Sequence, residues 1–90
     1  MEHVIDPRRH AWKATARVLV LYNPKGQWRY AVYNDKGVLD GMLDASAEAA
    51  PEEAQAQLLA EVEEITEQRY VARWTQNRPH WWTADLIVTL

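Results

Sequence analysis

A five-residue phrase occurs twice within residues 21–37, and it constrains the fold more than any other feature of this sequence. The two copies are Tyr22-Asn23-Pro24-Lys25-Gly26 and Tyr33-Asn34-Asp35-Lys36-Gly37. In each, the Asn side chain can hydrogen-bond the backbone two residues on, and Pro or Asp suits the second turn position. The Gly tolerates the positive φ that ends a hairpin connection with a bulge. Each copy therefore predicts a turn between antiparallel strands.

The segments around these turns have strand character. Residues 27–32 are rich in aromatic residues, and they lie between apolar runs at residues 14–22 and 38–43. Because short turns force antiparallel pairing, the spacing predicts a three-stranded meander. Both faces of the first strand become apolar towards its end, which predicts a central strand or one covered on both sides. Gly41 interrupts the third strand and predicts a bulge.

The second half of the chain predicts one helix followed by strands. Residues 44–50 form a linker of small residues, and Pro51 then suits the first helical position, with Glu52 and Glu53 in the first turn. Apolar residues recur at helical spacing to residue 68, namely Ala54, Leu58, Val62 and Ile65, widened by Leu59. The glutamates, including Glu63 and Glu64, lie mostly off this stripe, towards water.

The C-terminal third alternates again. Residues 69–75 predict a strand and residues 76–79 a turn, while residues 81–90 have a period of two that favours a strand over a short helix beginning at Pro79. The predicted fold is α+β in two layers, with element order βββαββ and the amphipathic helix packed on one face of an antiparallel sheet. We expect a single domain over residues 14–90, preceded by an irregular lead-in at residues 1–13.

Composition excludes several classes of protein. With no cysteine among 90 residues, there is no disulfide scaffold, no thiolate nucleophile and no cysteine-ligated metal. No segment reads as a signal peptide or a membrane span, so we expect a cytoplasmic protein without membrane contact. The net charge of −3 is segregated: residues 34–68 hold one Lys against ten acidic residues, whereas six Lys or Arg oppose two acidic residues in residues 1–33.

Catalytic and metal-binding groups are sparse. Ser46 lies in the alanine-rich linker without a nucleophile elbow, and His80 is the one histidine inside the predicted fold. Adjacent Glu63 and Glu64 would point about 100° apart on a helix, so they cannot act as a facing acid–base pair. His3, Asp6 and His10 match no strong ligand spacing. We therefore expect no enzyme activity, no cofactor and no metal.

Groups suited to recognition are more abundant. The chain has five Trp and four Tyr but no Phe, and Trp and Tyr are enriched at interfaces. One interpretation places Trp28, Tyr30, Trp74 and Trp82 in the core under the helix. We expect the free surface to carry the binding candidates, which are Trp12, Arg17, Lys25, Arg29, Tyr33, Arg73 and Trp81.

Three segments together resemble the three-stranded, arm-type DNA-binding domains of phage integrases. They are Gly26-Gln27-Trp28-Arg29-Tyr30, Asp35-Lys36-Gly37 and the helix start Pro51-Glu52-Glu53-Ala54. The resemblance covers about a third of the chain and implies a small sheet that binds DNA. The chain departs from this pattern where the family has basic residues leading into the third strand, because Val38-Leu39-Asp40-Gly41 stands there.

Three functional hypotheses follow from these residues. The first is a non-catalytic module that binds a protein, or a second copy of itself, through an aromatic-rich sheet face or edge. The second is nucleic-acid binding, with Arg17, Arg29 and Arg73 on phosphates and aromatic rings against unstacked bases. The third is an acidic mimic of nucleic acid that acts through the helix carboxylates.

Overall fold

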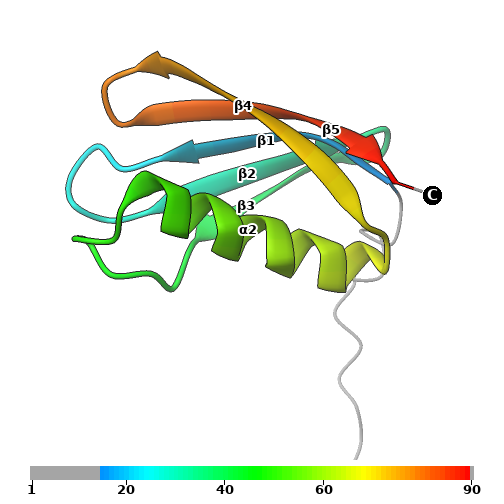
Figure 1. Cartoon of the computed structure of the whole chain (residues 1–90), viewed down its shortest axis with the longest axis horizontal. Helices are drawn as coiled ribbons and strands as arrows, with labels where there is room; N and C mark the ends of the chain where they lie inside the picture. The colour runs from blue at the N-terminus through cyan, green and yellow to red at the C-terminus, as the bar shows by residue number, and fades with distance from the viewer. Residues whose placement is uncertain (1–14, 90) are drawn as a thin grey trace, which may run out of the picture.

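Five strands form one antiparallel sheet, and a single helix lies across it, in a computed structural model that describes residues 15–89 (Figure 1). The elements are β1 (Ala16–Tyr22), β2 (Arg29–Asn34), β3 (Gly37–Met42), α2 (Pro51–Thr66), β4 (Tyr70–Arg78) and β5 (Trp81–Val88). The predicted two-layer α+β class and the order βββαββ are confirmed. The predicted lead-in at residues 1–13 lies outside the described residues.

The spatial order of the strands is β3-β2-β1-β5-β4, so β1 is the central strand. The meander ends at one edge of the sheet, and α2 then carries the chain across to β4 at the opposite edge. The β4–β5 hairpin turns back and places β5 against the free side of β1. A central position explains why β1 is apolar on both faces, as the sequence indicated.

The two copies of the repeated phrase form different turns. At the second, Asn34 Oδ1 accepts hydrogen bonds from the backbone N–H groups of Lys36 at 2.7 Å and Gly37 at 3.1 Å, as predicted. At the first, the strands are joined by a longer loop over residues 23–28, in which Gly26 has a φ of +75°. There the Asn23 N–H donates to the carbonyl oxygen of His80 at 2.9 Å, so this loop is tied to the β4–β5 turn.

The core lies between α2 and the face of the sheet that carries Leu19, Leu21, Val32, Trp82 and Ala84. From the helix, a stripe at spacing of four residues is buried and comprises Ala54, Leu58, Val62 and Thr66. The interpretation of four aromatic residues as core is confirmed. Trp28 and Trp82 are buried with ring centroids 5.6 Å apart, while Tyr30 and Trp74 pack against the cluster half-buried.

The last turn of α2 is held by a chain of hydroxyl groups that the apolar pattern did not reveal. The Tyr70 hydroxyl donates to Thr66 Oγ1 at 2.8 Å and accepts from the Ala16 N–H at 3.1 Å, and Thr66 in turn donates to the Val62 carbonyl. Ile65 and Leu59 pack half-buried against the core, as predicted, while Thr66 occupies a buried position that the apolar spacing did not predict.

Glu63 also departs from the prediction that it faces water. Its carboxylate is half-buried and accepts the Tyr70 backbone N–H at 3.0 Å, which links the helix to the start of β4. At the other end of the helix, Glu53 Oε1 accepts the Ala50 N–H at 3.0 Å and so satisfies a backbone donor at the N-terminus. The carboxylates of α2 therefore include two with structural roles.

Two further details of the strands differ from the predictions. The predicted turn at residues 76–79 is wrong, because β4 continues to Arg78, with a register shift between Gln76 and Arg78, and the turn consists of Pro79 and His80. The bulge predicted at Gly41 is also wrong, since β2 and β3 pair without a shift. A Cβ atom at Gly41 would lie 3.1 Å from the Tyr30 hydroxyl, so the glycine makes room for this ring.

Candidate interaction surface on the open face of the sheet

The helix covers one face of the sheet and leaves the other, which we call the open face (Figure 1). Because residues directly opposite each other in antiparallel strands point to the same side, the pairing registers identify its members. Its side chains belong to Val18, Val20, Tyr22, Arg29, Ala31, Tyr33, Val38, Asp40, Met42, Val71, Arg73, Thr75, Arg78, Trp81, Thr83, Asp85 and Ile87.

Apolar side chains are concentrated on the open face. Among the described residues, six large hydrophobic side chains are exposed, and five of these belong to the open face: Tyr33 (45%), Val38 (51%), Met42 (56%), Val71 (54%) and Ile87 (57%). The sixth, Val88, is paired with the buried Tyr70. Single exposed apolar residues are normal, but their collection on one side of a sheet is typical of a contact surface.

A row of stacked side chains crosses the open face at the end where the β1–β2 and β4–β5 turns meet. The Arg78 guanidinium carbon lies 5.2 Å from the centre of the Trp81 ring, and the Trp81 and Tyr22 rings stack with centroids 4.6 Å apart. On the other side of Tyr22 the register places Arg29, and beyond it Met42. Stacking of this kind holds large, rigid side chains in place before a partner binds. Binding would therefore cost these side chains little further conformational entropy.

Charges of both signs lie on the open face, and they are arranged unevenly. Arg73 and Arg78 lie on the edge strand β4, and Asp85 of β5 is directly opposite Arg73. At the other edge, β3 contributes Asp40. On the open face the edge strand β4 is therefore basic and the edge strand β3 acidic, while the strands beside them carry Asp85 and Arg29.

The structure brings together four of the seven binding candidates. Arg29, Tyr33, Arg73 and Trp81 share the open face, with Trp81 half-buried in its stack. Lys25 is exposed in the β1–β2 loop. Trp12 lies outside the described residues.

Arg17 occupies a position that simple alternation did not predict. Strict alternation places it beside Leu19 and Leu21 on the core side, but the register of β1 shifts between Ala16 and Val18, and this irregularity leaves Arg17 exposed. Its guanidinium forms a salt bridge of 3.0 Å with Asp35 in the β2–β3 turn. Arg17 is therefore engaged within the chain.

Sequence reasoning missed several members of the open face, including Tyr22, Val38, Met42, Arg78 and Ile87. Their period of two shows that they alternate, but not which face the helix covers. The partnership of Tyr22 with Trp81 depends on the pairing of β1 with β5, which are about 60 residues apart in the chain. Local sequence carries no signal for this pairing.

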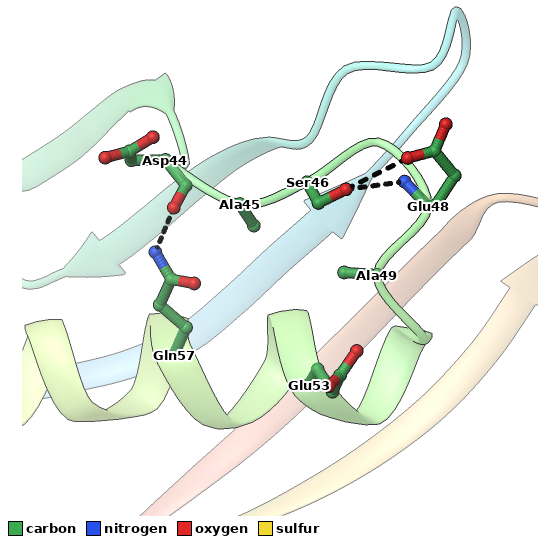
Figure 2. Close-up of a pocket in the computed structure, with 7 residues that line it drawn as sticks. All are labelled: Asp44, Ala45, Ser46, Glu48, Ala49, Glu53 and Gln57. Atoms are coloured by element: carbon green, nitrogen blue, oxygen red, sulfur yellow. Dashed lines mark hydrogen bonds between the residues drawn. The ribbon is translucent and has the colours of Figure 1, made fainter.

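A second candidate site is a depression of about 430 Å³ between the linker and the start of α2 (Figure 2). Figure 2 shows that the carboxylates of Asp44, Glu48 and Glu53 do not converge on a common point. The polar groups around them serve the linker: Gln57 Nε2 donates to the Asp44 carbonyl at 2.6 Å, and Ser46 Oγ accepts the Glu48 N–H at 3.2 Å.

This depression is therefore a structural feature of the linker. The indole N–H of Trp28 donates to the Ser46 carbonyl at 3.1 Å and fixes the same segment to the core. Across residues 15–89, no group of three or more His, Asp or Glu side chains is placed to hold a metal ion. His80, the other side chain weighed for catalysis, forms the exposed β4–β5 turn with a φ of +65°.

No helix in the described part of the chain is long and apolar enough to cross a membrane. The resemblance to integrase arm-type domains accounts for three strands and a helix, whereas this sheet has two further strands that include the partner of β1. Comparisons with protein-family models, with curated proteins and with solved structures found no match to this chain.

Proposed function

We propose that the protein is a non-catalytic binding module whose open face docks onto another protein. The observation that carries the proposal is the collection of five exposed, large apolar side chains on the face opposite α2. Burial of these side chains on binding would contribute roughly 25 cal/mol per Å² of apolar area removed from water. The stacked Arg78, Trp81 and Tyr22 supply the rigid aromatic and arginine groups that are typical of interface hot spots.

Site-specific photo-crosslinking in the native host tests this proposal. A photoreactive amino acid replaces Val38 or Ile87, which are exposed on the open face, and Glu64, exposed on α2, serves as the control position. We expect discrete protein adducts from positions 38 and 87 and none from position 64. Adducts from position 64 alone, or none at any position, would contradict the proposal.

Nucleic-acid binding is the second candidate, because Arg29, Arg73 and Arg78 share the open face with Tyr22, Tyr33 and Trp81. The balance of charge argues against it. Asp40 and Asp85 would lie against phosphates, and the face is apolar where a phosphate-binding surface is usually basic.

A binding experiment with the purified protein decides between the two candidates. Titration with single-stranded and double-stranded oligonucleotides at several salt concentrations measures the electrostatic contribution to affinity. If three arginines neutralised phosphates, the logarithm of the affinity would fall with the logarithm of salt concentration with a slope of about −2 to −3. We expect no binding at physiological salt, and crosslinked adducts from position 38 that resist nuclease.

A further inference from the structure

We propose that the occupant of the open face is a second copy of this chain, bound face to face about a two-fold axis that runs parallel to β1. The inference rests on the proposed function and specifies the partner. Its basis is the distribution of charge and apolar side chains across the five strands, which is complementary to itself under this one symmetry operation.

A two-fold axis along β1 reverses the order of the strands and keeps their direction. It therefore places β3 of the second copy opposite β4, and β2 of the second copy opposite β5. Sheets that pack face to face keep their strand directions within about 30° of each other, at a separation of about 10 Å. The arrangement is an aligned sandwich of two sheets, with both helices outside.

Charge complementarity favours this axis. β4 carries Arg73 and Arg78, and β3 carries Asp40, so the axis along β1 brings the basic edge of one copy against the acidic edge of the other. A two-fold axis perpendicular to the strands would instead place each edge strand against its own counterpart. Asp40 would then lie near Asp40 and β4 near β4, and juxtaposed like charges disfavour association.

The apolar groups fit the same arrangement. Val18, Val20 and Tyr22 of the central strand lie on the axis and would meet their own counterparts, giving the contact an apolar centre.

The size of the face is sufficient for a reversible dimer. Five strands spaced about 4.8 Å apart and seven residues of β1 at about 3.4 Å each give a sheet area of roughly 500 Å² per copy before side-chain relief is added. Stable interfaces bury about 800 Å² of accessible surface per partner, and weak or transient ones bury less. We therefore expect association that depends on protein concentration.

A charge-swap experiment on the purified protein tests both the partner and the axis. Sedimentation velocity over a wide range of concentration measures the dimer fraction for the wild type and for D40R and R73D. Each variant places like charges together twice in its own dimer, so we expect each to dimerise about tenfold more weakly or worse. When D40R and R73D are mixed, each edge of one variant again meets an edge of opposite charge on the other, so a heterodimer should form.

Matched controls separate this effect from a change in net charge. E64R changes the charge by as much as D40R, and K36D by as much as R73D, at exposed positions of α2 and of the β2–β3 turn. Both controls should dimerise like the wild type. Thermal unfolding of every variant, followed by circular dichroism, identifies any that fail to fold. V20E, whose carboxylate would meet its own counterpart on the axis, disrupts the same face independently.

Each alternative outcome overturns a defined part of the inference. A wild type that stays monomeric throughout excludes a second copy, while crosslinks from Val38 and Ile87 to a different protein would leave the proposed function in place. A wild-type dimer that D40R, R73D and V20E leave intact uses another surface, such as the edge of β4. Variants that weaken the dimer singly but do not associate when mixed exclude the axis along β1.

Discussion

At the scale of single residues, Tyr70 connects three elements through one hydroxyl group. Its oxygen accepts the Ala16 N–H at the start of β1 and its proton is donated to Thr66 at the end of α2, while its own backbone N–H is bound by Glu63. Tyr70 and Thr66 are both buried. A buried donor that loses its acceptor retains the full cost of desolvation.

Removing this hydroxyl should therefore be costly although the ring remains. We predict that Y70F lowers the free energy of unfolding by about 1–3 kcal/mol, because the Ala16 N–H is left without its acceptor. Urea-induced unfolding followed by circular dichroism measures the change. Y33F, which removes a hydroxyl from an exposed ring, is the matched control and should be neutral in the monomer. Equal effects of the two changes would contradict the role given to Tyr70.

His80 is a second residue with a structural role, and its backbone conformation sets that role. It has a φ of +65° in the turn after Pro79, a conformation that residues with a Cβ atom rarely adopt. We predict that H80V lowers the free energy of unfolding by about 1 kcal/mol or more, since β-branched residues are the least suited to this region. H80G should be neutral or stabilising. Thermal unfolding of both variants gives the comparison, and a stability order with valine above glycine would show that the turn does not require this conformation.

At the scale of elements, the attachment of α2 depends on a narrow stripe of small and medium side chains. Leu58 is the largest fully buried side chain of the helix, and it belongs to the same apolar cluster as Leu19 and Leu21 of the central strand. The helix has a left-handed residue, Glu67, where glycine is most common, and its ends are held by Glu53 and Glu63. Packing, rather than capping alone, must hold the helix on the sheet.

Truncation of Leu58 should therefore weaken the packing of the entire helix α2 on the sheet. We predict that L58A lowers the free energy of unfolding by about 2–5 kcal/mol, through lost burial and the cavity left behind. E64A, on the exposed side of the same helix, should change it by less than about 0.5 kcal/mol. Denaturant unfolding of both variants provides the test. A small effect of L58A would mean that the helix contributes little to the core.

At the scale of the whole molecule, the sheet is organised around β1, whose two neighbours are the next strand in the sequence and the last strand of the described chain. β1 pairs with β2 on one side and β5 on the other, while β3 and β4 each pair with one strand within residues 15–89. The backbone amides of β1 are thus enclosed on both sides. Protection from hydrogen exchange is greatest where local opening cannot expose an amide.

This arrangement gives a prediction for native-state hydrogen exchange. The amides of Leu19, Val20 and Leu21 should exchange only through global unfolding, whereas outward-facing amides of β3 and β4 should exchange through local opening at lower free energy. Exchange followed by nuclear magnetic resonance at several denaturant concentrations measures both classes. Protection of the two edge strands equal to that of β1 would contradict the strand order or indicate that both edges are covered in solution.

The order of the strands also explains which parts of the structure could be predicted from the sequence. The turns, the meander and the helix were predictable, because Asn34, Gly26 and Pro51 act on their immediate neighbours. The extent of β4, the irregularity at Arg17 and the buried position of Thr66 were not, because they depend on which strands become neighbours. The open face was predicted in part: Arg29, Tyr33 and Arg73 follow from alternation, whereas the Tyr22–Trp81 stack requires the long-range β1–β5 pairing.

The late arrival of β5 has a consequence for biosynthesis. Val18 of β1 pairs with Asp85, a residue synthesised 67 positions later. At translation rates of about 5–20 residues per second, one side of β1 stays unpaired for roughly 3–13 s after it is made. During that interval the nascent chain presents the backbone groups of its most apolar strand to other chains, so its yield in the cell should depend on how fast the ribosome completes the last hairpin.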